Sequence, residues 1–481
     1  MQYHATTNDT SGKRPWLLML ILVACSVRLI PEIIAYPIPT GYDVINYYIP
    51  VLTNFENHWS IVSTQFPLYV LILHFISSIT SFAPKILVPA AGILIYVLFS
   101  VSIYYLGKRL FRLDNSDSFF LSLFVIFQSS LLRTTWDLHK DMLALTAMFF
   151  AISLGLTSKD ISKGLFFLVL GLCIVSVLSD RMYGLLLVVT LIVFTIIKRT
   201  KKEIILSAVT SIIFFIAVAQ SSVQIQSNVQ IFSGAASNSY YNQINLILLF
   251  LVTSGILIPF GIVGFVNVRE SILKIPLLLS FIGSFLWFIH PTFFSIVPDR
   301  WMIIFSIFLS VFSGYGIVFL LWKRSAFGIK CRTFRMIVAL VPFVIIGMLF
   351  AVSNSDRPIS LFAPFHYYIG QFGPITMQAN SISISASKSI ISAISWVNQN
   401  TPQGSIIVID KHWRGWTELE LKNRSFLYYE DMANLIAHHQ NYYILISSPS
   451  SSLPNSWGAK VQLVHKEEGF LIYETLFNKM T

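Results

Sequence analysis

Residues 36-YPIPTGYDVINYYIP-50 follow the first apolar run of the chain and decide how the remaining runs are placed. Pro37, Pro39 and Gly41 interrupt any helix and favour a turn. Asp43 is therefore expected just outside the first membrane span, on constrained backbone. A Tyr-rich segment follows it directly.

This stretch opens a long loop, residues 36–85, whose charge is unusual. The loop carries two acids, Asp43 and Glu56, and no Lys or Arg occurs between Arg28 and Lys85. Ionisable groups at the edge of a membrane are candidate functional residues, so this loop is a candidate catalytic loop of a membrane enzyme. The alternative is an ordinary connecting loop, because most loops only join two elements.

The composition is that of a polytopic membrane protein. The chain has 481 residues, of which 55% are hydrophobic and 11% charged, and soluble domains usually have about 25% charged residues. A net charge of +11 would suggest nucleic-acid binding in a soluble protein. In a membrane protein the excess is expected in cytoplasmic loops, so nucleic acid is set aside as a partner.

The cysteines exclude a disulfide framework and a cysteine metal site. Cys25, Cys173 and Cys331 all fall in or beside expected spans. An exported domain without disulfides suits an archaeon or a bacterium. Residues 13–30 resemble the start of a signal peptide, but further spans follow directly, and a retained first helix is expected.

The distribution of Lys and Arg sets the topology. With every apolar run crossing the membrane, the basic clusters near residues 108–112 and 198–202 would lie outside, against the positive-inside rule. Treating Phe66 to Thr80 as an in-plane or re-entrant segment corrects this and leaves about eleven spans. The N-terminus is then cytoplasmic, residues 1–352 form the membrane domain, and residues 353–481 form a soluble domain outside.

The tail reads as a small α/β domain. A helix is expected at 383–398 and another at 430–439, with strands at 405–410, 425–429 and 442–447. A closing hairpin is expected from 461–465 and 470–474 around a Gly. Alternation of strands and helices predicts an α/β layer.

Six basic residues of the membrane domain stay outside, and nearly all have an acid close by in sequence. Arg28 lies four residues before Glu32, and Asp180 precedes Arg181. The six are Arg28, Lys85, Arg133, Lys140, Arg181 and Arg300. A cationic cluster opposite an acidic loop suits a substrate whose phosphate is held and whose hydroxyl or amide is activated. The alternative is a set of helix-end ion pairs.

These features together resemble the GT-C membrane glycosyltransferases, which include oligosaccharyltransferase catalytic subunits, protein O-mannosyltransferases and aminoarabinose transferases. The resemblance rests on Gly41-Tyr42-Asp43, the in-plane segment, 136-WDLHKD-141 and the soluble outer tail. It implies a polyprenyl phosphate-linked sugar donor, and it implies that Asp43 acts on the acceptor. In oligosaccharyltransferases that acid binds a metal with an Asp-x-Glu, where this chain has Asp137-Leu-His139, and the Trp-Trp-Asp signature is missing from the tail.

The resulting hypothesis is an inverting glycosyltransferase on the outer face of the cell membrane, with Asp43 as general base. The acceptor is a protein, a lipid or a glycan. A divalent metal is not required by this mechanism, and the candidate ligands for one are Asp43, Asp137 and His139. The donor phosphate is assigned to Arg133, Lys140, Arg181 and Arg300, with Glu32, Asp137, His139 and Asp141 in support.

Two other classes stay open. A transporter or lipid-linked glycan flippase would also contain intramembrane charges, although transporters usually show inverted repeats and charges at the bilayer midplane. Here the charges gather at outer helix ends, and no repeat is visible. A noncatalytic assembly factor or receptor, with the tail as its binding module, is the third interpretation.

Overall fold

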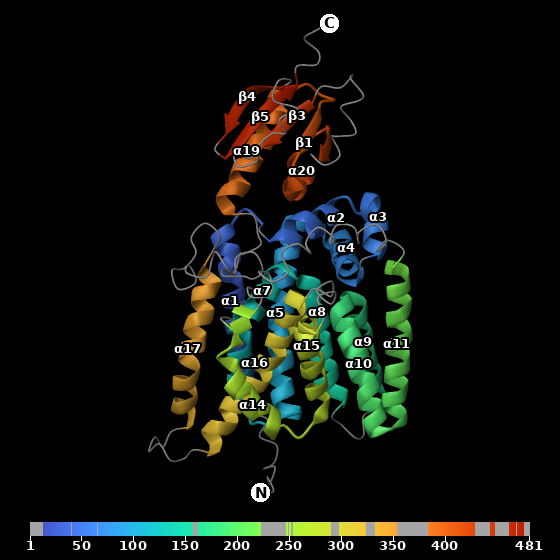
Figure 1. The fold of residues 1–481 in the computed structure, drawn as a ribbon, viewed down its shortest axis with the longest axis vertical. Helices are drawn as coiled ribbons and strands as arrows, with labels where there is room; N and C mark the ends of the chain where they lie inside the picture. Colours follow the sequence, from blue (N-terminus) through green and yellow to red (C-terminus); the bar gives the residue numbers. More distant parts are fainter. Residues whose placement is uncertain are drawn as a thin grey trace.

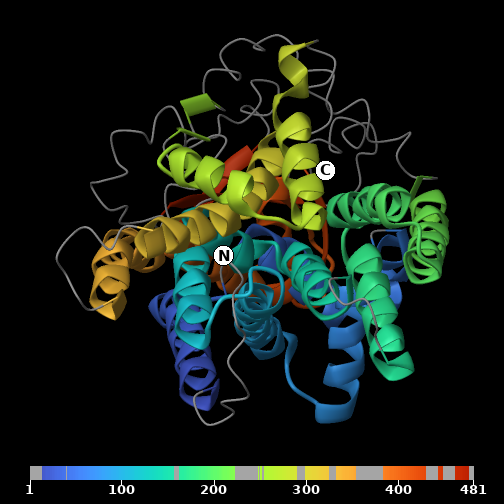
Figure 2. The same cartoon turned by 90° about the horizontal axis from the view of Figure 1, so that it is seen from below.

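The computed structural model describes residues 13–39, 41–64, 66–156, 162–222, 247–248, 250–251, 254–289, 298–323, 332–353, 383–428, 443–447, 461–467 and 469–475. A bundle of helices carries a small β-sheet domain at one end (Figure 1). In the view along the bundle the sheet lies behind the helices (Figure 2), so the domain sits over the bundle rather than beside it.

Seven of the described helical segments are long and apolar enough to cross a membrane, which makes the chain a multi-pass membrane protein. They lie side by side in the bundle (Figure 1). They are α1 (Lys13–Ala35), α5 (Pro84–Arg109), α10 (Arg181–Lys198), α11 (Lys201–Ser222), α15 (Lys274–Phe285) with its flanking turns η4 (Ser271–Leu273) and η5 (Leu286–Phe288), α16 (Pro298–Lys323) and α17 (Arg332–Val352).

Four further helices complete the bundle. They are α6 (Asn115–Ile126), α8 (His139–Ala151, continued by the π-helix η2, Ile152–Leu156), α9 (Lys163–Ser179) and α14 (Leu257–Asn267). α6 is followed by α7 (Ser129–Asp137) at a bend of 68°, and the two together are apolar enough to count as one broken span. Among the described residues, seven helices, or eight spans when the α6–α7 pair counts as one, are long and apolar enough to cross, fewer than the eleven or so that the charge distribution predicts, because α8, α9 and α14 are shorter.

The long first loop forms a helical layer at the end of the bundle that carries the sheet (Figure 1). It consists of the π-helix η1 (Val44–Tyr48), α2 (Ile49–Thr53), α3 (Phe55–Thr64) and α4 (Leu68–Thr80). α4 has 13 residues and is about 20 Å long, too short to cross a hydrocarbon core of about 30 Å. This agrees with the prediction of an in-plane segment there.

The C-terminal domain contains one five-stranded sheet in the order β2-β1-β3-β5-β4. Its strands are β1 (Ile406–Ile409), β2 (Ser425–Tyr428), β3 (Tyr443–Ser447), β4 (Val461–Glu467) and β5 (Phe470–Thr475). The first three pair in parallel, and β5 runs antiparallel to both β3 and β4. α19 (Ile384–Asn400) contacts β4 and β5, which gives the predicted α/β layer.

The expected strands and the first helix of this domain are confirmed within one or two residues. A short helix that the sequence did not indicate, α20 (Arg414–Glu420), follows β1 and the turn η9 (Lys411–Trp413). The helix expected at 430–439 lies outside the described residues. The division at residue 352 stays a prediction, although α17 ends there and every described strand follows it.

Candidate active site

Asp43 and Asp137 meet where the first loop reaches the junction of α7 and α8. The backbone N–H of Asp43 donates a hydrogen bond of 2.7 Å to Asp137 Oδ1. Asp43 precedes the first residue of η1, and Asp137 is the last residue of α7. Two acids that are 94 residues apart in sequence are therefore neighbours in space.

Gly41 allows this approach. Its φ of +105° lies in the region that residues with a Cβ rarely adopt. A Cβ at this position would also lie 3.3 Å from Asp137 Oδ1 and 3.2 Å from Val44 Cγ2. The glycine in the turn thus brings the loop backbone up to the carboxylate of α7.

Cations surround the acid pair. Arg133 Nη2 donates to Asp137 Oδ2 at 3.0 Å, and both side chains are buried, with 6% and 5% exposed. The charges of Lys140, Arg300 and Arg133 all act on the Asp43 carboxyl. Three of the four cations that the sequence assigned to a phosphate therefore lie around Asp43.

The carboxyl of Asp43 is poised to take a proton near neutral pH. Burial and, after it, the adjacent Asp137 raise its pKa to about 6, against the opposing effect of the three cations. A general base works best when its pKa lies near the working pH. The position of Asp43 and its raised pKa therefore both suit a general base.

Arg28 holds the α7–α8 junction from the first span. Its side chain is fully buried, and its Nε donates to the Thr135 carbonyl at 3.3 Å. Its guanidinium lies over the Trp136 ring at 5.0 Å. Glu32 neutralises it through a contact of 2.8 Å, so Glu32 acts as the partner of Arg28.

His139 is packed among tyrosines of the first loop. Its ring stacks on Tyr48 at 5.6 Å, and its Nδ1 shares a hydrogen bond of 2.9 Å with the Tyr69 hydroxyl. Both tyrosines are buried. This arrangement makes His139 a bridge between α8 and the layer formed by η1 and α4.

The loop before α10 contributes an acid to this region. Asp180 caps α10, because its Oδ1 accepts from the N–H groups of Met182 and Tyr183 at 2.8 and 3.0 Å. Its side chain also hydrogen-bonds with Asp141, on which Lys140 and Arg300 act. Arg181 is exposed, and within the described ranges no contact joins it to Asp43.

Several buried polar atoms near the acid pair have no hydrogen-bond partner among the described residues. An unpaired buried polar atom costs about 1–3 kcal/mol, so native structures usually provide it with a partner or a ligand. A ligand rich in hydroxyl or phosphate oxygens would satisfy most of them. The atoms are Arg28 Nη2, Arg133 Nη1, Trp136 Nε1, His139 Nε2 and Asp141 Oδ1.

The candidate metal ligands Asp43, Asp137 and His139 are not arranged to bind one ion together. Asp137 uses Oδ1 for the Asp43 N–H and Oδ2 for Arg133. His139 uses Nδ1 for Tyr69 and lies against Tyr48. Among the described residues, no group of three His, Cys, Asp or Glu side chains is placed to hold a metal ion. We therefore derive no step through a metal.

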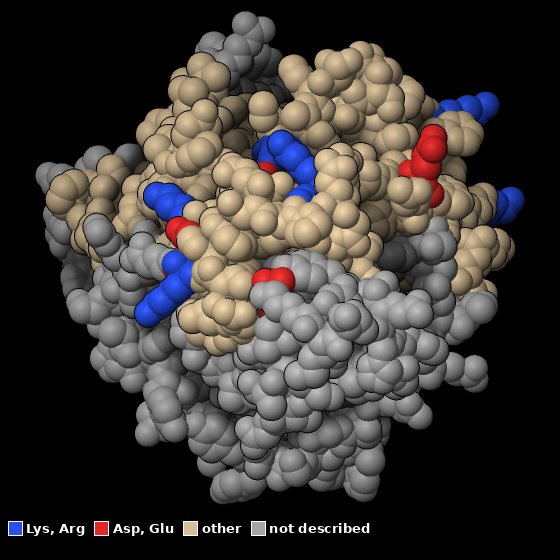
Figure 3. Space-filling view, turned by 90° about the horizontal axis from the view of Figure 1, so that it is seen from above, with Lys and Arg blue, Asp and Glu red and all other residues tan. Residues whose placement is uncertain are grey.

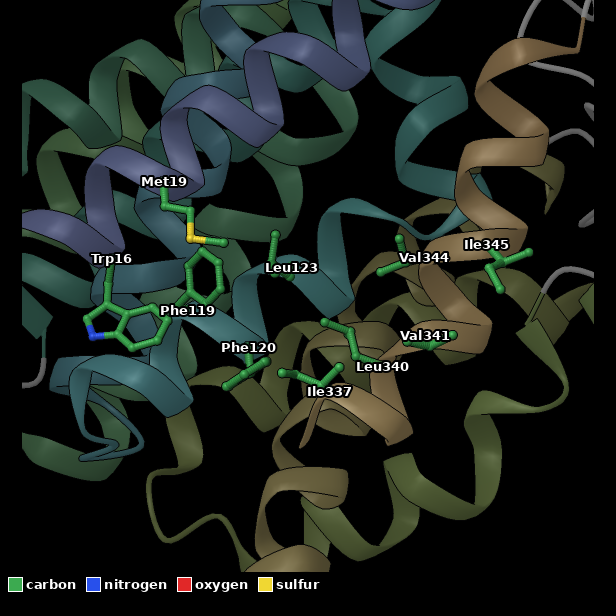
Figure 4. A pocket seen from close by; sticks show the side chains of 10 residues that line it. All are labelled: Trp16, Met19, Phe119, Phe120, Leu123, Ile337, Leu340, Val341, Val344 and Ile345. Carbon is green, nitrogen blue, oxygen red and sulfur yellow. The ribbon is translucent and has the colours of Figure 1, made fainter. Parts of the chain in front are cut away.

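An apolar cavity of about 500 Å³ lies far from these polar groups. Figure 4 shows it between α1, α6 and α17. Trp16, on its wall, precedes Arg28 by twelve residues of α1, or about 18 Å along the helix. Because only apolar side chains line it, this cavity has no groups for acid–base chemistry. It is lined by Trp16, Met19, Phe119, Phe120, Leu123, Ile337, Leu340, Val341, Val344 and Ile345.

Charged side chains on the face that carries the C-terminal domain are sparse. In Figure 3 the described part of this face is mainly uncharged, with acidic and basic groups in small separate places. Among the described residues, Lys85 and Glu420 form an ion pair at 2.6 Å. The described part of this face has no broad basic surface of the kind that binds nucleic acid.

Comparison with known proteins identifies the fold. No protein-family model and no curated protein sequence matches the chain. Among solved structures, ArnT from Cupriavidus metallidurans bound to undecaprenyl phosphate superimposes with a TM-score of 0.58 and 11% identity, over 95% of this chain and 98% of ArnT. The same protein in the apo state gives 0.53 and 11% identity, over 95% and 97% of the two chains.

A second enzyme shares the arrangement in part. The arabinofuranosyltransferase AftD from Mycobacteria superimposes with a TM-score of 0.50 and 7% identity, over 96% of this chain and 40% of AftD. The chain therefore shares its fold with these two transferases, as the resemblance implies.

Proposed function

We propose that this protein transfers a sugar from a polyprenyl phosphate-linked donor to an acceptor at the outer face of the membrane. The observation that carries the proposal is the contact between Asp43 and Asp137, with three cations acting on the Asp43 carboxyl. It is supported by the likeness in fold to ArnT, whose structure contains undecaprenyl phosphate.

The proposed reaction is a single displacement. The acceptor oxygen or nitrogen attacks the anomeric carbon from the face opposite the phosphate and gives its proton to the Asp43 carboxylate. The bond between that carbon and the phosphate oxygen breaks, and its electron pair stays on the phosphate. Lys140 and Arg300, whose charges act on the Asp43 carboxyl, stabilise that developing charge. The displacement inverts the anomeric centre.

Purified protein in lipid nanodiscs provides the test. Polyprenyl phosphate donors with different radiolabelled sugars are supplied together with membrane extracts as a source of acceptors. Release of polyprenyl phosphate together with transfer of label to an acceptor supports the proposal. Movement of intact donor across the bilayer without cleavage would instead identify a flippase.

The rate should depend on pH through Asp43. The raised pKa of about 6 means that the carboxyl is mostly protonated below pH 6 and mostly ionised above pH 7. A general base must be ionised, so kcat/KM is expected to be flat above about pH 7 and to fall about tenfold per pH unit well below 6. A profile of kcat/KM from pH 4.5 to 8.5 measures this. Asp137→Asn should shift the midpoint to lower pH, because Asp137 raises the pKa of Asp43.

Substitutions of the cations should distinguish Lys140 and Arg300, which act on Asp43, from Arg181. Lys140→Gln and Arg300→Gln are each expected to lower kcat/KM for the lipid donor about 10- to 100-fold, because a hydrogen bond to a charged group contributes about 1.5–3 kcal/mol. Arg181→Gln is the matched control and should change it less than about threefold, since Arg181 is exposed and apart from Asp43. An equal loss in Arg181→Gln would place the phosphate at the start of α10 instead.

A further inference from the structure

The C-terminal domain touches the first loop on both sides of Asp43. On one side the His412 ring lies 5.9 Å from the ring of Tyr42. On the other side the backbone N–H of Gly415 donates to Asn46 Oδ1 at 2.8 Å. Tyr42 immediately precedes Asp43, and Asn46 follows it by three residues. Asp43 therefore lies in a short segment that the domain contacts at each end.

The contact at Gly415 is a close approach of two backbones. A Cβ at this position would overlap the Ile45 carbonyl group, so only glycine fits here. Backbone atoms move less readily than the ends of side chains, and a shift in α20 would therefore be transmitted to η1. The bond to Asn46 also provides a partner for an N–H of the first turn of α20, which has none within the helix.

Ionic contacts fix α20 over the loop at further points. Glu418 accepts from Arg414 Nε at 2.7 Å and lies 3.8 Å from His58 Nε2. Glu420 pairs with Lys85 at 2.6 Å. His58 lies in α3 and Lys85 at the start of α5, so α20 also contacts the membrane domain beyond η1.

The opposite side of η1 is held by the membrane domain. Tyr48 stacks on His139, and the N–H of Asp43 donates to Asp137. The π-helix is thus enclosed between α20 and the α7–α8 junction.

We propose that α20 is a positioning element for Asp43, acting through the contact of Gly415 with Ile45 and Asn46. This inference rests on the proposed function, because it gives the C-terminal domain a part in the same reaction. Gly415 and Asn46 do not touch the reacting atoms. They set where the general base stands relative to Asp137, and a misplacement of about 1 Å can cost about 100-fold in rate.

The test uses the full chain with Gly415→Ala and, separately, Asn46→Ala. Each is expected to lower kcat about 10- to 100-fold and to leave KM for the lipid donor within about twofold, because the cations near the phosphate are unchanged. The midpoint of the pH profile should move to lower pH, because Asp137 raises the pKa of Asp43 and the two acids would stand further apart. In the double variant the two losses should not multiply, since both changes break one contact.

The matched control is Gly171→Ala, the same substitution at a site in α9 where a Cβ meets nothing within 4 Å. It should leave kcat and the midpoint unchanged. Gel filtration and thermal unfolding in detergent show whether each variant is folded. If Gly415→Ala does not fold, Asn46→Ala decides, because it adds no atom to the contact.

Two results would overturn the inference. One is a folded Asn46→Ala variant with normal kcat, and the other is a variant with raised KM, normal kcat and an unmoved midpoint. Asp43→Asn is measured alongside to separate this inference from the proposed function. If Asp43→Asn transfers sugar at the natural rate, Asp43 is not the general base and the positioning role falls with it, whereas a natural protein that cleaves no donor would show that the proposed function is wrong. If it is inactive while the Gly415 and Asn46 variants are normal, only the positioning role is lost.

Discussion

Asp43→Asn is expected to lower kcat at least about 1,000-fold while the protein stays folded. General base catalysis contributes about 10²- to 10⁴-fold, and an amide cannot accept the acceptor's proton. The hydrogen bond to Asp137 comes from the Asp43 backbone and not from its carboxyl, so the substitution leaves that contact in place. The measurement is release of polyprenyl phosphate from a labelled donor at pH 7.5, with thermal unfolding in detergent to follow the fold.

Glu56→Gln is the matched control for this result. It makes the same change from acid to amide within the same loop, at an exposed position in α3. Its turnover should remain within about twofold of the natural protein. Equal turnover in both variants would remove Asp43 from the chemistry.

Arg133→Met is expected to destabilise the protein by about 3–5 kcal/mol, because it leaves the buried Asp137 carboxylate without its cation. Turnover should fall as well, since Asp137 also receives the Asp43 N–H. The free energy of unfolding is measured by denaturant titration in detergent. Lys85→Met tests the contrast: Lys85 is 45% exposed in its pair with Glu420, and such surface pairs contribute about 0.2–1 kcal/mol.

The double variant Arg133→Met/Asp137→Leu separates stability from function. Replacing both members of a buried pair by apolar groups often restores stability, and here most of the loss should be recovered. Turnover should not return, because the N–H of Asp43 would have lost its acceptor. If Arg133→Met were as stable as the natural protein, the pair of Arg133 and Asp137 would contribute no net stability.

Much of the fold follows from local patterns in the sequence. The positions of Lys and Arg identified the in-plane segment that contains α4, and apolar runs bounded by turn residues located β1, β2 and β3. α20 was missed because seven residues with mixed polarity give no clear period. Its position depends on a contact between residues 369 apart, which no local pattern encodes.

The candidate site was predictable as a set of loops but not always by residue. Asp43, Asp137, Arg133, Lys140 and Arg300 come together as the outer charges suggested. In the loop before α10, Asp180 rather than Arg181 contacts the buried charges. Asp180 caps α10 and hydrogen-bonds with Asp141, whereas Arg181 is the first residue of the helix and is exposed. An Asp directly before a helix is a usable signal for such a cap.

The role of Arg28 could not be inferred from spacing. Its distance of four residues from Glu32 predicts an ion pair on one helix, and that pair exists. Its contacts with Thr135 and Trp136, however, join elements over 100 residues apart. Only the assembled bundle reveals that this buried cation supports the end of α7.

The 68° bend between α6 and α7 affects how this part of the chain is inserted into the membrane during synthesis. α7 contains Arg133 and Asp137, and a segment with such charges is costly to place in lipid by itself. It is in contact with α16, which the ribosome produces long afterwards. During translation α7 is therefore expected to wait at the membrane surface until α16 has inserted. The proposed site would then be completed late in biogenesis, although Asp43 lies near the N-terminus.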